Sequence, residues 1–400
     1  MPSKTVESPD TATNTPDRIL QAAEQLFSED GRADPRLVSF ADRRHRAGTL
    51  NSCAVSAMTL KKILLLSLGG TITMTGGSGP GIQPTLNADD LVRAVPGLER
   101  VAVLKTLSPM RIPGPSLGID DVIGVARLLI ARLAGDVDGT VVIQGTDTIE
   151  ETAFLLDLLV PGDKPVVVTG AMRGPEAAGA DGPANVLAAV TVAASDEARG
   201  QGVVVVLNDQ IHAARFVQKT HTAWPSTFMS PASGPIGAVI EGRAWVALQP
   251  RRHAPIALPG LVTGEPAVPL PGLANGEQPA VALIRLSLGD DGRLLRVLPE
   301  LGYRGAVIEA MGAGHAPASV APLLDDLVHA MPVVLGTRVA AGAVFRSTYG
   351  FPGSEIDLLA RGAIHGGSLG GLKSRLLLTL LLRTGLTRAE LECEFLARAG

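Results

Sequence analysis

The sequence has few of the features that mark disulfide-bonded, membrane-spanning or nucleic-acid-binding proteins. Only two cysteines occur among 400 residues, Cys53 and Cys393, so a disulfide framework is not expected and a reducing compartment is favoured. No apolar run reaches the length of about 18 residues that a membrane-spanning helix needs. The 35 basic and 39 acidic residues give a net charge of −4, which predicts no nucleic-acid partner.

Metal-ligand and export signals are missing as well. The seven histidines show no paired spacing such as His-Glu-x-x-His, so no metal site is predicted. Lys61-Lys62 followed by four apolar residues imitates the start of a signal peptide. This run is internal and short and leads directly into a glycine turn, so we interpret it as the first core strand. We therefore expect a cytoplasmic protein.

The composition of the chain changes near Met58. Residues 1–57 are dominated by Ser, Thr, Asp, Arg and Pro, and we expect a disordered or wrongly annotated extension there. The whole chain is 46% hydrophobic and 18% charged, which is typical of a well-buried protein. Its length allows two domains of ordinary size.

Strand-like and helix-like segments alternate from residue 58 to about 250. This pattern predicts crossover units on a mainly parallel sheet, that is, an α/β domain. Residues 251–278 are rich in Pro and Gly and are predicted to be a linker before a second α/β domain at 279–400. The predicted strands are 62–68, 101–107, 140–144, 165–169, 202–207, 280–286, 305–309 and 331–335, and the predicted helices are 88–94, 119–133, 150–159, 183–193, 372–382 and 387–397.

Two threonine-bearing turns follow predicted strands. Gly-Gly-Thr-Ile at 69–72 follows the first strand, and Gly-Thr-Asp-Thr-x-Glu-Glu at 145–151 follows the strand at 140–144. Open α/β sheets keep their ligand crevices at such carboxyl ends of strands. The glycines would let Thr71 approach a substrate, but a threonine hydroxyl needs a base and an oxyanion site to act as a nucleophile. By themselves such turns are more often structural or phosphate-binding, and Asp147 with Glu150 also fits a helix capping box.

In this order the two turns resemble the signatures of the L-asparaginase/glutaminase family. Lys-Pro-Val-Val-Val-Thr-Gly-Ala-Met-Arg at 164–173 and Ser-Pro-x-x-Gly-Pro-Ile-Gly at 230–237 resemble further segments of that family, and the resemblance covers residues 58–400. It implies a larger N-terminal domain with a mainly parallel sheet and flanking helices, and a smaller, flavodoxin-like C-terminal domain. It also implies that no cofactor is needed.

The resemblance also implies a set of catalytic residues. Thr71 would be the nucleophile that forms an acyl-enzyme. Thr146, Asp147 and Lys219 would activate the water that hydrolyses it, and Asp147 would also hold the substrate's α-ammonium. A buried lysine beside a carboxylate can help to deprotonate a neighbouring hydroxyl. The expected activity is therefore hydrolysis of L-asparagine to L-aspartate and ammonia.

Further residues are expected to bind the substrate. The backbone of Ala171 would lie at the substrate's amide, while Asp181-Gly182-Pro183 is interpreted only as a turn that starts a helix. His315 stands in the segment that resembles the family's Gly-x-Gly-Asn turn. Glu355 aligns with a glutamate that one subunit lends to its neighbour's site. A homotetramer of intimate dimers, or a homodimer, is expected, although both residues also fit ordinary structural or surface roles.

The chain departs from the family's pattern at two places. The family's lid carries a Tyr, but residues 71–91 contain none, so Thr73 or Thr75 is a candidate to replace it. The family's Gly-Ser-Gln-Asp has its best counterpart in Pro-Ser-Leu-Gly at 115–118. Ser116 would bind the α-carboxylate there, but Leu117 has no acceptor for an ammonium group. These departures leave open a non-enzymatic amino-acid sensor, and an ammonia-releasing amidotransferase subunit is a second alternative.

Overall fold

The computed structural model describes residues 59–76, 82–84, 86–261 and 278–400. The prediction for residues 1–57 and most of the predicted linker lie outside these residues. The described chain from Leu60 onward forms one compact unit. Within that part of the chain, no helix combines the length and the apolar character that crossing a membrane would require.

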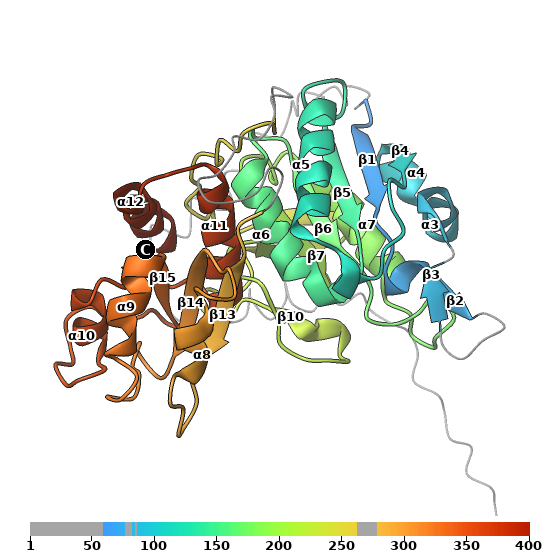
Figure 1. Ribbon diagram of the computed structural model, residues 1–400. Helices are drawn as coiled ribbons and strands as arrows, with labels where there is room; N and C mark the ends of the chain where they lie inside the picture. Colours follow the sequence, from blue (N-terminus) through green and yellow to red (C-terminus); the bar gives the residue numbers. More distant parts are fainter. Residues whose placement is uncertain (1–58, 77–81, 85, 262–277) are drawn as a thin grey trace, which may run out of the picture. The chain divides into compact units, whose positions relative to one another are not determined.

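A sheet of eight strands forms the centre of the N-terminal region (Figure 1). Strands β7, β6, β5, β1 and β4 are parallel, whereas β8, β11 and β12 extend the sheet in antiparallel fashion. In spatial order the strands are β12 (Arg243–Val246), β11 (Gly237–Ile240), β8 (Gln210–Ala213), β7 (Val203–Leu207), β6 (Val166–Thr169), β5 (Gly139–Ile143), β1 (Lys62–Ser67) and β4 (Val103–Leu107).

Strands β1, β5, β6 and β7 are nearly continuous apolar runs because both faces of the sheet are covered there, whereas the edge strand β4 is partly exposed. In β1, Leu64 and Leu66 point into the core on one face, and Ile63 and Leu65 point into the core on the other. The predicted mainly parallel sheet with flanking helices is confirmed. Helices α5 (Ile119–Leu133) and α6 (Ile149–Leu159) cover the first face, and α3 (Ala88–Ala94), α4 (Leu98–Val101) and α7 (Gly182–Ala193) cover the second.

The antiparallel edge of the sheet is not predicted by the sequence pattern. Strands β7 and β8 are joined by Asn208-Asp209, whose φ angles of 51° and 58° are those of a tight hairpin turn. Two further small hairpins carry parts of the candidate site. They are β2 (Met74–Gly76) with β3 (Ile82–Pro84), and β9 (Gln218–Lys219) with β10 (Phe228–Met229).

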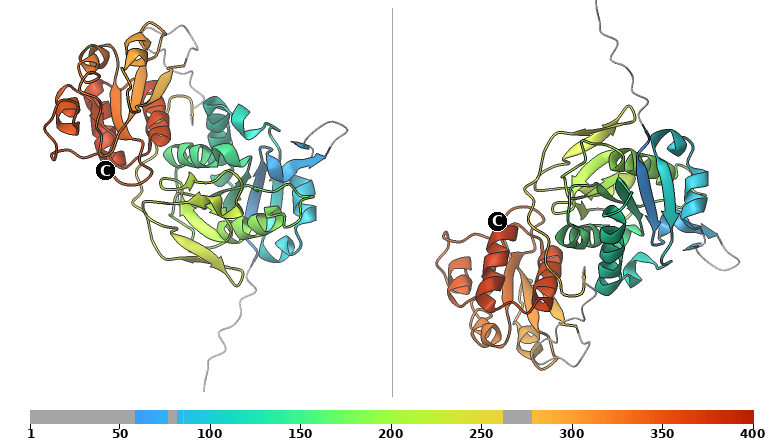
Figure 2. Two further views of the ribbon diagram at one scale, coloured as in Figure 1. Left: turned by 90° about the horizontal axis from the view of Figure 1, so that it is seen from below. Right: turned by 90° about the horizontal axis from the view of Figure 1, so that it is seen from above.

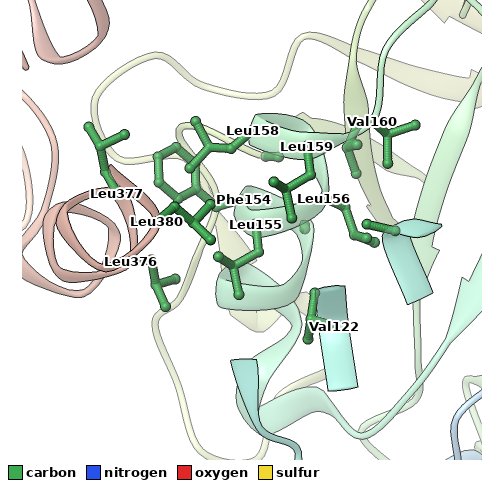
Figure 3. Packing of buried hydrophobic residues seen from close by; sticks show 14 of the residues in the cluster. Val122, Phe154, Leu155, Leu156, Leu158, Leu159, Val160, Leu376, Leu377 and Leu380 are labelled. Atoms are coloured by element: carbon green, nitrogen blue, oxygen red, sulfur yellow. The ribbon is translucent and has the colours of Figure 1, made fainter. Parts of the chain in front are cut away.

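The C-terminal region has a parallel sheet of its own, as predicted (orange to red in Figure 2). Helix α11 is buried on most sides because it packs on this sheet and also on α6. Figure 3 shows the leucines of α11 beside the apolar residues of α6. The strands are β13 (Val281–Arg285), β14 (Gly305–Ala310), β15 (Val333–Thr337) and β16 (Ile364–His365), and the helices are α8 (Arg293–Val297), α9 (Leu323–Ala330), α10 (Glu355–Ala360), α11 (Gly371–Arg383) and α12 (Arg388–Ala399).

Candidate active site

The two threonine-bearing turns leave the same edge of the large sheet. Strands β1 and β5 are parallel neighbours, and the Leu68 backbone N–H donates to the Ile143 carbonyl at 2.8 Å. Gly70 has a φ of 95°, and a Cβ on it would lie 2.1 Å from the Gly145 nitrogen. Only glycine permits this approach, which brings the turns of Thr71 and Thr146 into backbone contact.

Thr71 begins a single 3₁₀ turn, Thr71–Thr73. The Thr73 hydroxyl donates to the Gly70 carbonyl at 2.7 Å and so closes the turn. Ile72 and Thr73 are buried, whereas Thr71 is only half-buried. Thr71 is therefore the residue of this turn that a bound molecule can reach. The side chain of Thr75, the other candidate to replace the missing Tyr, lies outside the described residues.

Thr146, Asp147 and Lys219 form one hydrogen-bonded group. Lys219 Nζ donates to Thr146 Oγ1 at 2.9 Å and to Asp147 Oδ1 at 2.7 Å. Thr146 is buried, while the side chains of Lys219 and Asp147 are 16% and 59% exposed. The group thus runs from the protein interior to its surface.

The capping-box interpretation of Asp147 and Glu150 is wrong. Helix α6 has Thr148 as its N-cap, without a side-chain capping bond. Asp147 instead binds the Lys219 ammonium, and Glu150 Oε1 accepts a hydrogen bond from the Lys219 backbone N–H at 3.2 Å. Both carboxylates therefore bind Lys219, a residue that the local sequence pattern cannot place beside them.

A buried histidine supports the hairpin that carries Lys219. His212 of β8 contacts Ser230 Oγ through Nδ1 at 2.9 Å and Gln210 Oε1 through Nε2 at 3.1 Å. Burial lowers the pKa of the His212 imidazole to about 4, so the ring is neutral at pH 7. The acceptor at Gln210 assigns the ring proton to Nε2, and the Ser230 hydroxyl then donates to Nδ1. Sequence reasoning missed His212 because its strand was not predicted.

Ala171 is held in place by residues of the following helix. Asp181 accepts hydrogen bonds from the backbone N–H groups of Met172 and Arg173, both at 2.9 Å. Asn185 Nδ2 donates to the Gly170 carbonyl at 2.9 Å. The interpretation of Asp181-Gly182-Pro183 as only a helix-starting turn is incomplete, because Asp181 also fixes the loop around the fully buried Ala171.

Ser116 is exposed at the end of a 3₁₀ turn, Gly114–Ser116, next to the second threonine-bearing turn. The Thr148 hydroxyl donates to the Gly114 carbonyl at 3.3 Å and links the two segments. Leu117 packs against the hydrophobic cluster that includes α5 and α6. Its position is therefore, at least in part, a packing position.

Glu355 and His315 form a separate pair in the C-terminal region. Glu355 is fully buried, and its Oε1 accepts the backbone N–H groups of Thr348 and Tyr349, both at 2.8 Å. Its Oε2 lies 3.3 Å from His315 Nε2. Burial raises the pKa of the Glu355 carboxyl, but the two N–H donors and His315 outweigh it and lower the pKa overall. The interpretation of Glu355 as a solvated acid is wrong.

The structure thus brings some predicted residues together and leaves others apart. Thr146, Asp147 and Lys219 are directly bonded, and the turn of Thr71 contacts that of Thr146. Within the described part of the chain, no hydrogen bond or ion pair links Glu355 to this group. No cluster of three or more His, Cys, Asp or Glu able to hold a metal ion occurs among those residues either.

Comparisons with known proteins agree with this arrangement. Residues 62–252 match the family model "Asparaginase, N-terminal", and residues 280–395 match "Glutaminase/Asparaginase C-terminal domain". A probable L-asparaginase of Deinococcus radiodurans is 35% identical over 345 residues, which are 84% of this chain and 98% of that protein. A probable periplasmic L-asparaginase of Haemophilus influenzae is 32% identical over 331 residues, 82% of this chain and 90% of that protein.

A solved structure also resembles this protein. The crystal structure of a probable cytoplasmic L-asparaginase from Campylobacter jejuni superposes with a TM-score of 0.73 at 29% identity, and the match covers 84% of this chain and 99% of that chain. Both sequence and fold therefore agree over most of the chain's length. The chain belongs to the L-asparaginase family.

Proposed function

We propose that the protein hydrolyses the side-chain amide of L-asparagine to L-aspartate and ammonia through a threonine acyl-enzyme. The observation that carries this proposal is the bonded group of Thr146, Asp147 and Lys219 in a turn that contacts the turn of Thr71. This arrangement places a candidate nucleophile, Thr71, and a candidate proton-transfer group, Thr146 with Asp147 and Lys219, at one edge of the sheet. The family relatives support the same substrate.

In the first half-reaction the Thr71 hydroxyl oxygen attacks the amide carbon. The tetrahedral intermediate places negative charge on the former carbonyl oxygen, and backbone N–H groups of the crevice stabilise it. When the carbon–nitrogen bond breaks, the nitrogen leaves as ammonia after taking up the hydroxyl proton, and an ester with Thr71 remains. Ala171, held by Asp181 through its neighbours, contributes the backbone that faces the amide.

In the second half-reaction water attacks the ester carbon, the bond from that carbon to the Thr71 oxygen breaks, and the proton lost by the water passes to this oxygen, which releases aspartate and restores the Thr71 hydroxyl. Thr146, whose hydroxyl oxygen accepts a hydrogen bond from Lys219 Nζ, relays this proton: it accepts a proton from the water and passes its own hydroxyl proton toward the Thr71 oxygen. Asp147 holds Lys219 in place. Asp147 Oδ1 binds Lys219, so its other oxygen remains for the substrate's α-ammonium. Ser116, exposed at the edge of the crevice, binds the α-carboxylate.

Steady ammonia release by the purified protein tests this function. We expect turnover with L-asparagine, and we expect Thr71→Ala to lower kcat roughly a thousandfold or more without altering the thermal melt. Assays with L-glutamine and the D-amino acids define the specificity. Binding of asparagine without turnover would identify a sensor instead, and a folded Thr71→Ala protein with normal turnover would exclude Thr71 as nucleophile.

We also propose that the protein is cytoplasmic and that it assembles as a homodimer or homotetramer with sites shared between subunits. The His315 ring, which lies beside Glu355, contacts the rings of Tyr349 and Phe351, and Phe345 stacks on Tyr349. These three aromatic residues are 41%, 46% and 45% exposed in that order, and exposed aromatic clusters suit interfaces. We propose domain limits of 58–250 and 279–400, with a linker at 251–278 and an extension at 1–57.

A further inference from the structure

The segment that carries Lys219 has little regular structure to hold it. Strand β9 consists of only two residues and pairs only with the equally short β10, apart from the large sheet. Two-stranded ribbons of this kind are weakly stable by themselves. The position of Lys219 relative to Thr146 must therefore depend on contacts made to the backbone just before it.

One such contact comes from α11 in the C-terminal region. Lys373 Nζ donates to the carbonyls of Val217 at 2.6 Å and Arg215 at 3.0 Å. Its side chain lies inside the protein, with 4% of the residue exposed, over the ring of Phe154. Lysines are rarely buried to this extent unless they are paired, because burying an ammonium group costs free energy. Burial accordingly lowers the pKa of Lys373 to about 8.

The second contact comes from α6, the helix that follows Thr146 and Asp147. Glu150 Oε1 accepts the backbone N–H of Lys219 itself. Glu150 also interacts electrostatically with Lys373. Burial raises the pKa of the Glu150 carboxyl, although the charges of Lys373 and Lys219 act to lower it. Asp157 and Arg215 are the other charged groups that act on Lys373. Glu150 of α6 and Lys373 of α11 therefore form hydrogen bonds to the same short backbone segment, residues 215–219.

These two helices are themselves packed firmly together. Leu376, Leu377 and Leu380 of α11 lie beside Phe154, Leu155 and Leu158 of α6 in one buried cluster (Figure 3). The contact couples the C-terminal region to the helix that begins at the candidate active site. A shift of α11 would therefore move the carbonyls of Arg215 and Val217, and with them Lys219.

We propose that Glu150 and Lys373 are positioning residues that hold the backbone of residues 215–219 so that the Lys219 ammonium reaches Thr146 and Asp147. This inference rests on the proposed role of Lys219. Neither residue needs to touch the substrate. Their effect reaches the reaction through the position of Lys219, and a misplacement of about 1 Å in such a group can lower the rate about a hundredfold.

Three substitutions test the proposal in the full-length protein. Glu150→Leu removes the acceptor for Lys219 N–H, whereas Glu150→Gln keeps a carbonyl oxygen there and removes only the charge. Lys373→Met removes both donors with little change in volume. We expect Glu150→Leu and Lys373→Met to lower kcat for asparagine about tenfold to a hundredfold, and Glu150→Gln to stay within about threefold of the wild type.

Two matched controls separate positioning from loss of stability. Glu151→Leu makes the same change at the next residue of α6, whose carboxylate interacts electrostatically with Glu150 and Arg375. Lys164→Met removes a lysine that donates to the carbonyls of Leu133 and Val137, both at 2.7 Å, far from Lys219 in sequence. Whatever the change in thermal stability, we expect both controls to keep kcat within about twofold of the wild type.

A double-mutant cycle shows whether the effect passes through Lys219. If it does, adding Glu150→Leu to Lys219→Met should change the residual kcat by less than about twofold. The inference fails if the two losses multiply, or if folded Glu150→Leu and Lys373→Met keep normal kcat while Lys219→Met is inactive. If Lys219→Met keeps normal activity, the proposed role of Lys219 fails as well. If Lys373→Met does not fold, the difference in kcat between Glu150→Leu and Glu150→Gln still tests the proposal.

Discussion

At the scale of single residues, the two threonine-bearing turns of the candidate site meet at two glycines. Gly70 lies against Gly145, and no side chain fits between them. We expect Gly70→Ala to destabilise the protein and abolish turnover, because the new Cβ must push apart the turns that carry Thr71 and Thr146.

Gly97 offers a matched control for this substitution. Its φ of 92° is close to the 95° of Gly70, although ψ is −8° at Gly97 and 179° at Gly70, so the control matches the sign of φ and not the whole backbone conformation; a Cβ on Gly97 meets nothing within 4 Å. Gly97→Ala should therefore cost only the backbone strain, about 1–2 kcal/mol, with normal activity in the folded protein. Urea unfolding and ammonia release measure both effects. Equal losses in the two variants would mean that the turns are not in contact.

His212 gives stability a predictable dependence on pH. Its pKa is about 4 in the folded protein and 6.5 ordinarily, so below pH 6.5 the unfolded chain binds a proton that the folded one does not. The contribution of His212 is therefore complete above pH 6.5 and is lost as the pH falls toward 4. Between pH 7.5 and pH 5 this loss amounts to about 2 kcal/mol.

His212→Gln removes this titration and keeps an amide that can bond to Ser230. Urea unfolding at pH 7.5 and pH 5 should show that the wild type loses about 2 kcal/mol more than His212→Gln over this interval. Other carboxylates and histidines titrate in both proteins, so only the difference between them is informative. Parallel curves would mean that His212 is protonated or accessible in the folded protein.

At the scale of secondary structure, the loop around Ala171 depends on one carboxylate. Asp181→Ala would leave the N–H groups of Met172 and Arg173 without their acceptor, at about 1–3 kcal/mol. We expect lower stability and a lower kcat/KM for asparagine, with Asp181→Asn in between. Asp136→Ala, which breaks exposed ion pairs with Lys62 and Lys105, should leave stability nearly unchanged. An unchanged kcat/KM in Asp181→Ala would remove this loop from the site.

Most regular elements could be predicted from the sequence because their pattern is local. The parallel strands are short apolar runs ended by turn residues, and α3 and α5 begin and end as predicted. The antiparallel edge was not predicted because its strands are only four residues long. Their turns, Asn208-Asp209 and Glu241-Gly242, lack the usual Asn-Gly signature.

The candidate site could be predicted only where a motif carries it. The two threonine turns have recognisable patterns, and Lys219 was placed by resemblance. The roles of Glu150 and Lys373 depend on contacts across 69 and 156 residues of sequence, and no local pattern encodes such contacts. Leu117 shows the limit of a motif. Its alignment with a substrate-binding position of the family does not reveal that its side chain packs against the core.

At the scale of the whole molecule, the proposed assembly predicts that two inactive variants complement each other. In a shared site, Thr71→Ala and Glu355→Ala chains combine so that one of the two sites in each hybrid dimer has both intact residues. Random association then restores about one quarter of the wild-type sites. Co-expression of differently tagged chains, followed by ammonia assays on the purified hybrids, measures this.

Three results would contradict the shared site. The first is a monomer with full activity in sedimentation. The second is an active Glu355→Ala protein. The third is hybrids that remain inactive although each parent variant is folded. Glu355→Gln serves as a control, because it keeps an oxygen for the N–H groups of Thr348 and Tyr349 and so preserves the fold around it.

The buried parallel strands determine how the protein loses activity once it unfolds. Strands β5, β6 and β7 carry no charged residue, and β7 is Val-Val-Val-Val-Leu. Once the molecule opens, these segments have the composition that promotes intermolecular β-aggregation. Heat inactivation would then be irreversible, and its rate would rise with protein concentration. The durability of this protein is therefore measured by a half-life at a stated concentration, and a melting temperature alone does not describe it.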